Sequence, residues 1–190
     1  MDSLTLGTVA VATVASAYMV AKRNLGSGQG GDDGQAAPAG PGNKPIEARN
    51  EKWTAPAAYA HMIEMAEQRH GLPPRLLERL LYEESRYRAD IISGRVRSPA
   101  GAIGIAQFMP ATAREWNVDP LNVAQSIDGA GRYLAWLRGK LGGWREALAA
   151  YNWGIGNVQR RGLMAAPRET SMYVVNIIKD VQNATGAEIN

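Results

Sequence analysis

The chain has 190 residues, enough for one domain of ordinary size with extensions, and its net charge of +3 favours anionic partners without identifying one. The absence of cysteine and the presence of only 2 histidines exclude disulfides and thiol catalysis and leave too few soft ligands for a zinc site, so we expect no cofactor and no metal. We also expect no nucleic-acid partner, because neither a nucleic-acid-binding motif nor a dense stripe of lysine and arginine accompanies the charge.

Residues 4–21 form a stretch without a charged side chain, which is followed by Lys22 and Arg23. Its length of about 18 residues just meets the minimum for a helix that crosses a membrane. A signal peptide would carry basic residues ahead of its apolar run, whereas Asp2 is the only charge there. We therefore predict that residues 1–23 are an uncleaved transmembrane anchor, with a buried or partner-bound helix as the alternative.

Residues 24–50 are rich in glycine, alanine and proline and cannot build a hydrophobic core. They are predicted to be a flexible linker, whose typical span on the order of 30 Å would let the following domain reach a substrate away from the anchor. Residues 51–190 then make up one folded domain.

The folded part shows helical rather than strand periodicity, which predicts a mainly α domain. Thr54 and Pro56 open a first helix that closes at Gly71, and the two prolines that follow open a second one in its first turn. Glycine and proline rule out long regular structure between residues 88 and 104. Further helices are predicted at residues 112–116, 126–141, 144–151 and 170–183.

The second helix contains a stripe of four leucines with a glutamate near its centre. At about 100° per residue, one face carries Leu76, Leu77, Leu80, Leu81 and Glu84. An ionised carboxylate on an apolar face is costly unless it meets a cation, and a carboxyl that instead keeps its proton is suited to act as a general acid. The plainer interpretation of Glu84 is a boundary residue or half of a buried ion pair. Neighbouring Glu83, one turn after Arg79, is expected to be exposed and ion-paired.

Four short motifs follow one another along the folded part. They are Glu84-Ser85, the glycine-rich block from Ser98 to Ala113, Ala149-Ala-Tyr151-Asn152-Trp-Gly154, and Glu169-Thr170-Ser-Met-Tyr173-Val174. In this order and spacing they resemble the lytic transglycosylase family, the relatives of goose-type lysozyme, over about residues 55–183. The resemblance implies a lysozyme-like catalytic domain. The chain departs from the family pattern at Ile105-Ala106 and Trp153, and residues 94–97 look like a short insertion.

The resemblance implies that Glu84 is the only catalytic carboxylate. It would protonate the glycosidic oxygen between N-acetylmuramic acid and N-acetylglucosamine, then take the proton of the muramic C6 hydroxyl, so that a 1,6-anhydro ring closes. Glycosidases that use the N-acetyl group of the substrate also work without a second carboxylate. Asp90 is the best candidate for a second acid if this is wrong, whereas Asp119 and Asp128 are interpreted as helix caps.

The resemblance further implies a set of substrate-binding residues, namely Ser98, Gly104, Gln107, Met109, Tyr151, Asn152 and Glu169. In this set, Tyr151 is expected to orient the Glu84 carboxyl and Asn152 to bind an acetamido group. Tyr173 is expected to pack in the protein rather than to contact the substrate. Trp153 is the only tryptophan expected to stack on a sugar.

Several of these residues also have a purely structural interpretation. Gly101 and Gly104 can serve turns, and Met109 alone would fill the core. Asn152 can cap a helix, and Glu169 can be a first-turn acid that the helix dipole favours.

The sequence thus leads to a hypothesis of a membrane-anchored peptidoglycan lytic transglycosylase that opens the cell wall during phage entry or envelope-spanning assembly. Its partners would be peptidoglycan glycan strands, the membrane, and other virion or envelope-complex proteins. The positive-inside rule would keep a domain after Lys22 and Arg23 in the cytoplasm, a conflict that delivery from a virion membrane would remove. The alternatives are a hydrolytic muramidase, a wall peptide endopeptidase on the same fold, and a non-catalytic wall-binding or structural virion protein.

Overall fold

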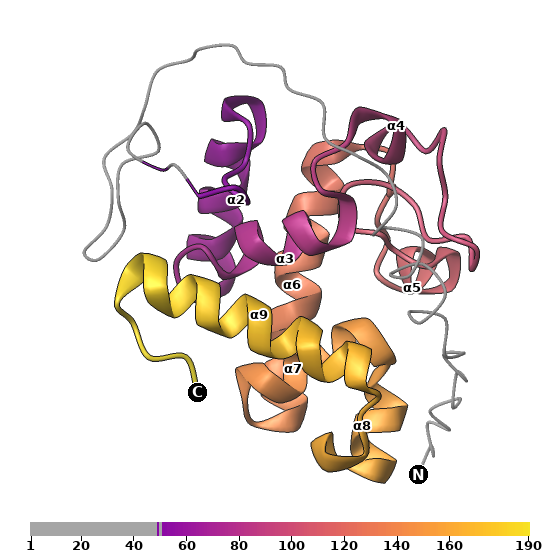
Figure 1. Cartoon of the computed structure of the whole chain (residues 1–190). Coiled ribbons are helices and arrows are strands. Elements are labelled where there is room, and N and C mark those ends of the chain that lie inside the picture. Colours follow the sequence, from indigo (N-terminus) through magenta and orange to yellow (C-terminus); the bar gives the residue numbers. More distant parts are fainter. Residues whose placement is uncertain (1–48, 50) are drawn as a thin grey trace, which may run out of the picture.

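The computed structural model describes residue 49 and residues 51–190, and in this part the regular elements are helices joined by turns and loops (Figure 1). In chain order the elements are α2 (Ala57–His70), α3 (Leu76–Ser85), α4 (Ala89–Ile92), α5 (Pro110–Glu115), α6 (Val123–Leu141), α7 (Trp144–Trp153), α8 (Ile155–Arg161), the 3-10 helix η2 (Leu163–Ala165) and α9 (Arg168–Thr185). The only β pairing in the described part is an isolated antiparallel bridge between Ile103 and Phe108. The prediction of a mainly α domain is confirmed.

The predicted anchor, residues 1–23, lies outside the described residues, and so does the predicted linker apart from residue 49. Within residues 49 and 51–190, none of the helices combines the length and the apolar character that crossing a bilayer requires.

Local sequence signals explain where most helices begin and end. Gly71 ends α2 in the left-handed conformation, with a φ of 65°, as expected for a glycine cap. The side chain of Asn122 accepts a hydrogen bond from Gln125 N and starts α6 at Val123, three residues earlier than predicted. Helix α8 and η2 were not predicted, because each is short and α8 lies between two glycines.

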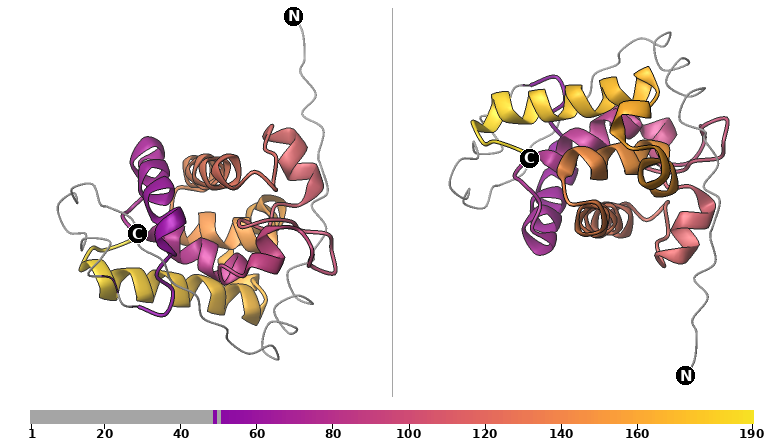
Figure 2. Two further views of the ribbon diagram at one scale, coloured as in Figure 1. Left: turned by 90° about the horizontal axis from the view of Figure 1, so that it is seen from above. Right: turned by 90° about the horizontal axis from the view of Figure 1, so that it is seen from below.

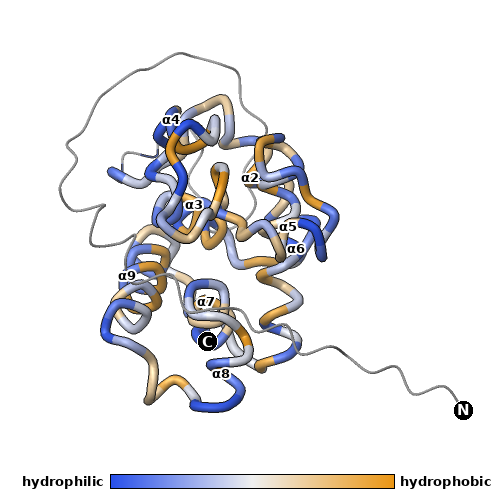
Figure 3. Tube along the Cα trace, turned by 90° about the vertical axis from the view of Figure 1, so that its right-hand side faces the viewer, coloured by the Kyte–Doolittle hydropathy of each residue, from blue (hydrophilic) through white to orange (hydrophobic). Residues whose placement is uncertain are grey.

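The helices pack around α3, α6 and α7. Helix α9 packs against both α3 and α7, while α6 packs against α2 and α7. The two views in Figure 2 show α9, drawn in yellow, running along one side of this assembly. Hydrophobic and hydrophilic residues alternate along α9 (Figure 3), and its buried face includes Tyr173, Val174, Ile177 and Ile178. The helix therefore covers the core while its other face meets water.

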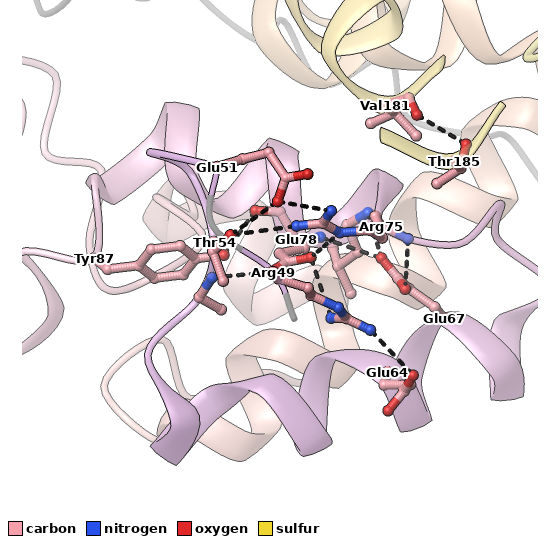
Figure 4. A network of polar contacts seen from close by, with 12 residues as sticks. Arg49, Glu51, Thr54, Glu64, Glu67, Arg75, Glu78, Tyr87, Val181 and Thr185 are labelled. Carbon is pink, nitrogen blue, oxygen red and sulfur yellow. Dashed lines mark hydrogen bonds and ion pairs between the residues drawn. The ribbon is translucent and has the colours of Figure 1, made fainter. Parts of the chain in front are cut away.

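A buried carboxylate of α2 caps the start of α3 (Figure 4). Glu67 Oε2 accepts a hydrogen bond from Arg75 N, and Oε1 accepts from Leu77 N and Glu78 N. These are backbone donors that a helix start leaves unpaired, so the α2 side chain does what a cap residue of α3 would otherwise do. Burial raises the pKa of Glu67 to about 8.

Two arginines hold the chain segment that precedes α2 against this helix start (Figure 4). Arg75, which is fully buried, pairs with Glu51 at 3.0 Å and with Glu78 at 2.8 Å. Arg49 pairs with Glu64 at 3.3 Å and with Glu78 at 3.4 Å. Arg49 belongs to the range predicted as linker, yet its side chain is only 3% exposed. The folded domain therefore takes in residue 49.

Candidate functional site

Glu84 lies in the last turn of α3, directly before the point where the helix ends. The predicted stripe of Leu76, Leu77, Leu80 and Leu81 is confirmed, because all four side chains are fully buried. Glu84 itself is half-buried, so the expectation that it occupies a core position is wrong. The helix passes through the core and brings the carboxyl at its end toward the surface.

Backbone and side-chain contacts fix the end of α3 behind Glu84. The hydroxyl of the buried Ser85 donates to Leu81 O at 3.0 Å and accepts from Tyr87 N at 3.2 Å. Arg86 and Tyr87 both adopt a φ of 53°, so the chain leaves the helix through two consecutive left-handed residues. The Tyr87 hydroxyl then donates to Glu78 O at 2.7 Å. The Glu-Ser motif is thus a helix end that gives Glu84 a defined position.

The hydroxyl of Tyr173 donates a hydrogen bond to Glu84 Oε1 at 2.8 Å. Tyr173 lies on α9, and its ring is 2% exposed. Burial, the charge of Glu84 and the hydrogen bond itself raise the pKa of Tyr173 well above its usual value, so its phenol remains a donor. The ring packs in the core as expected, and its hydroxyl makes in addition a hydrogen bond to Glu84 that was not predicted.

Tyr151 occupies a different role from the one expected. Its hydroxyl donates to Ala106 O at 2.9 Å and ties α7 to the glycine-rich block. Burial, followed by the charge of Glu84, raises the pKa of Tyr151 well above its usual value. Tyr151 is therefore within electrostatic range of Glu84, but it is Tyr173 whose hydroxyl is bonded to the carboxyl.

Glu83 is buried rather than exposed, contrary to the expectation from the helical face. Its side chain is 6% exposed and forms ion pairs of 2.8 Å with Arg79 and with Arg86. Arg79 also pairs with Asp180 of α9 at 2.8 Å, which closes this face of α3 against α9. The predicted ion pairing of Glu83 is confirmed, and the two neighbouring glutamates do differ in their partners.

The glycine-rich block forms a tight loop in front of α5. Ser98 Oγ accepts from Ala102 N at 2.8 Å, and the amide of Gln107 donates to Gly104 O at 2.8 Å. Gly104 has a φ of 79°, and a Cβ there would stand 1.9 Å from Pro120 O. Packing against Pro120 explains why this position needs glycine, and its role toward a sugar stays a prediction.

The remaining predicted binding residues come from three elements. Met109 is half-buried directly before α5, and Asn152 is half-buried near the end of α7. Thr170 Oγ1 donates to Asn152 Oδ1 at 2.8 Å, a contact between α9 and α7 that no local sequence pattern predicts. Glu169 is half-buried in the first turn of α9, where the helix dipole favours an acid.

One pocket lies beside this group, lined by Arg145, Ala149, Leu163, Ala166, Thr170, Ser171, Val174 and Val175. Thr170 and Val174 of the late Glu-Thr motif are among its lining residues. Glu84 and the predicted binding residues do not.

The other candidate acids are already engaged. A hydrogen bond from Arg88 lowers the pKa of Asp90. Partial burial acts to raise the pKa of Asp128, but hydrogen bonds from His70 and Arg69 outweigh burial and lower the pKa. Asp128 lies inside α6 and pairs with α2, so its interpretation as a helix cap is wrong.

Asp119 accepts a hydrogen bond from Leu121 N in a turn ahead of α6. The cap residue of α6 is Asn122, so the interpretation of Asp119 as a helix cap is also wrong.

Among residues 49 and 51–190, no group of three or more His, Cys, Asp or Glu side chains is placed to bind a metal ion. Trp153 is 4% exposed and belongs to the core, so the expectation that it stacks on a sugar is wrong.

Comparisons with known proteins agree with this arrangement. The family model described as the transglycosylase SLT domain matches residues 61–173. Membrane-bound lytic murein transglycosylase F 1 of Alkalilimnicola ehrlichii is 33% identical over 131 residues, which cover 64% of this chain and 25% of that protein. Membrane-bound lytic murein transglycosylase F of Saccharophagus degradans is 32% identical over 123 residues, which cover 60% of this chain and 22% of that protein. This chain thus spans about a quarter of the length of these relatives.

Among solved structures, the crystal structure of an inactive mutant of the lytic transglycosylase Slt from Pseudomonas aeruginosa has a TM-score of 0.58 with this chain. The two are 21% identical, and the match covers 71% of this chain and 26% of the other. At this identity the likeness concerns the fold, and the predicted lysozyme-like fold is confirmed.

Proposed function

Because the chain belongs to the transglycosylase SLT domain family, we propose that it is a peptidoglycan lytic transglycosylase. In this proposal it cleaves the β-1,4 bond between N-acetylmuramic acid and N-acetylglucosamine and leaves a 1,6-anhydromuramic end. Glu84 is the catalytic residue. The two relatives described above carry murein transglycosylase in their names, which is consistent with this substrate.

The observation that carries the proposal is the hydrogen bond from Tyr173 to Glu84. A carboxyl that must give up a proton and take one back needs a fixed orientation toward the scissile bond. The phenol of Tyr173 provides this orientation from a separate helix. Because it remains a donor, it also stabilises the carboxylate that forms once Glu84 has given up its proton.

The proposed reaction needs one protein carboxyl and returns it to its starting state. The proton of Glu84 goes to the glycosidic oxygen as the bond from that oxygen to the muramic C1 breaks. The N-acetyl group of the muramic residue stabilises the positive charge at C1. The Glu84 carboxylate then takes the proton of the C6 hydroxyl while O6 bonds to C1. No water is consumed, and Glu84 is protonated again.

The engagement of the other acids supports this one-carboxylate scheme. The hydrogen bonds from Arg88 to Asp90 and from His70 and Arg69 to Asp128 favour the ionised forms, which cannot donate a proton. Both side chains are thereby poorly suited to act as a general acid.

Substrate contacts in the proposal come from the predicted binding residues. Thr170 fixes the amide of Asn152 by donating to its oxygen, which turns the amide nitrogen into a donor for an acetamido carbonyl. Gln107 is held by its bond to Gly104 O at the edge of the glycine-rich loop. Ser98, Gly104, Met109 and Glu169 complete the proposed set, with Tyr151 supporting the loop from α7.

We also propose that residues 1–23 anchor the protein in a membrane and that residues 24–48 act as a linker, since Arg49 belongs to the folded domain. The uncharged stretch of residues 4–21 supports this, and the relatives named above are described as membrane-bound. Delivery from a phage virion membrane, together with other virion or envelope-complex proteins, would bring the domain to the wall from outside. The anchor predicts that the full chain partitions into the detergent phase of a phase-separation assay. Recovery in the aqueous phase would refute it.

Analysis of products from purified peptidoglycan tests the catalytic proposal. The wild-type chain should release fragments with 1,6-anhydromuramic ends that contain no ¹⁸O when the reaction runs in labelled water. Glu84→Gln should release none while it keeps its circular dichroism spectrum, since glutamine retains the shape and cannot donate the proton. Asp119→Asn, at an exposed turn, is the matched control and should remain active.

Each alternative gives a different product. Reducing ends that contain ¹⁸O would identify a muramidase, cut stem peptides an endopeptidase, and strand binding without products a non-catalytic protein. Any of these three results would refute the transglycosylase assignment.

A further inference from the structure

An aromatic cluster connects Tyr151 with the surface of α6. The ring centroids of Tyr151 and Tyr133 lie 5.5 Å apart. Tyr133 lies 5.0 Å from Trp116 and stacks on Trp136 at 6.0 Å. The two tryptophans meet edge to face at 5.5 Å. The Tyr151 hydroxyl donates to Ala106 O, so these rings form a path from the glycine-rich block outward to the surface of α6.

The outer end of this path is open to solvent. Trp136 is 38% exposed, and Trp116 and Tyr133 are half-buried. Tyr133, Trp136 and Lys140 follow one another at helical spacing on one face of α6, while Leu134 and Leu137 are fully buried on the core side. The exposed face of a surface helix ordinarily carries polar side chains. Trp116 and Tyr133 also pack in part against the core, whereas Trp136 is the exposed ring that the core does not account for. We call Trp116, Tyr133 and Trp136 the aromatic platform.

Cationic groups flank the platform on both of its tryptophans. The guanidinium carbon of Arg132 lies 5.4 Å from the centre of the Trp116 ring, and its Nη2 donates to the backbone oxygen of Trp116. Lys140 Nζ lies 5.7 Å from the centre of the Trp136 ring. Flat rings offer an apolar surface to the faces of pyranose sugars, and the cations offer partners for carboxylates. This combination fits a polysaccharide that carries acidic groups.

We propose that the aromatic platform is a distal glycan-binding site, which binds saccharide units of the same peptidoglycan strand that is cut at Glu84. The inference rests on the function proposed above. Two observations select this occupant over a protein or a lipid surface. The platform is continuous with the predicted binding residue Tyr151 through Tyr133, and its flanking positive charges complement the free carboxylates of the stem peptides.

Binding measurements on a variant that cannot cleave test the platform separately from catalysis. The background is the full chain with Glu84→Gln, and the probes are purified long glycan strands and single disaccharide-peptide units, followed by calorimetry. Adding Trp136→Ala should weaken binding of long strands on the order of tenfold, as expected for truncation of an aromatic contact. Binding of the short units should not change, because they occupy the Glu84 site alone. Trp136→Tyr should recover most of the affinity.

Met164→Ala is the matched control, since Met164 is the most exposed large hydrophobic side chain of the described residues and lies on η2, outside the platform. It should leave both affinities unchanged. Trp136→Ala is expected to fold, because the side chain is partly exposed, and circular dichroism checks this.

If the Glu84→Gln chain binds long strands with equal affinity with and without Trp136→Ala, the proposed glycan-binding role of the platform is refuted. The same holds if the substitution abolishes binding to anionic phospholipid vesicles and not to glycan, because the occupant would then be a membrane. In either case, release of anhydro products by the wild-type chain would leave the proposed function intact. Absence of products from the wild-type chain would instead refute the function itself.

Discussion

The substitution Tyr173→Phe removes one hydroxyl and keeps the buried ring, so it isolates the hydrogen bond to Glu84. Phenylalanine fills the same volume on α9, and the packing against α3 and α7 should persist. What the variant loses is a 2.8 Å bond between a phenol and a carboxyl that must hold one orientation during two proton transfers.

The expected loss in rate follows from the strength of this bond. A hydrogen bond to a charged group contributes about 1.5–3 kcal/mol. At about 1.4 kcal/mol for each factor of ten in rate, cleavage should slow roughly 10- to 150-fold. The loss should appear in kcat, because Tyr173 acts on Glu84 rather than on the glycan.

Tyr151→Phe is the matched control, since it removes the same atom from a second buried tyrosine. Its hydroxyl bonds to the neutral carbonyl of Ala106, so the variant should lose about 1 kcal/mol of unfolding free energy and keep its activity within a few fold. Initial rates of fragment release from purified peptidoglycan measure kcat, and thermal unfolding at the same pH measures stability. A wild-type rate in Tyr173→Phe, or a larger loss of rate in Tyr151→Phe, would refute the assignment of the orienting role to Tyr173.

Four further substitutions test how the site and the folded domain are supported. Gly104→Ala should lower the free energy of unfolding by about 2–5 kcal/mol, because the new Cβ would collide with Pro120 O. Gly101→Ala has open space around its Cβ, so it should lower the free energy of unfolding by only about 1–2 kcal/mol, the cost of a positive φ in alanine. Urea unfolding of both variants measures the difference. Because the pKa of Glu67 is raised from 4.5 to about 8, the folded chain holds one more proton than the unfolded chain between these values. This contribution to stability is complete below pH 4.5 and falls by about 1.4 kcal/mol per pH unit up to pH 8. The free energy of unfolding of Glu67→Gln should therefore depend less steeply on pH than that of the wild-type chain. An unchanged slope would contradict the protonated state of Glu67. Arg49→Ala should destabilise the domain by about 3 kcal/mol in urea, since it breaks buried ion pairs, and a loss below about 0.5 kcal/mol would show that residue 49 does not belong to the fold.

Periodicity was sufficient to predict the helices with a clear apolar face. The leucines of α3 lie where the helical spacing puts them, and Asn122 shows why α6 starts earlier than its hydrophobic pattern suggested. Helix α8 carries only seven residues between glycines, too few for a period to be visible.

The candidate site could be predicted only in part, because several of its contacts join distant segments. Glu84 and Tyr173 are 89 positions apart, and nothing in their local patterns says which tyrosine meets the carboxyl. The burial of Glu83 was not predicted for a similar reason, since this face of α3 packs against α9, where Asp180 pairs with Arg79. Trp153 and Trp136 look alike as residues, and only the packing of α7 and α6 shows which one reaches the surface.

The ion pairs at the start of α3 also determine how the domain responds to ionic strength. Dissolved ions weaken pairs that water reaches, such as Arg69 and Asp128, whose side chains are 60% and 37% exposed. Ions reach the Arg75–Glu78 pair far less, because these side chains are 0% and 2% exposed. Concentrated salt would therefore weaken the exposed ion pairs on the surface of the domain. The buried ion pairs that hold the segment before α2 against the start of α3 would remain. The helix that carries Glu84 would keep its geometry at ionic strengths that change how strongly a charged polymer adheres to the protein.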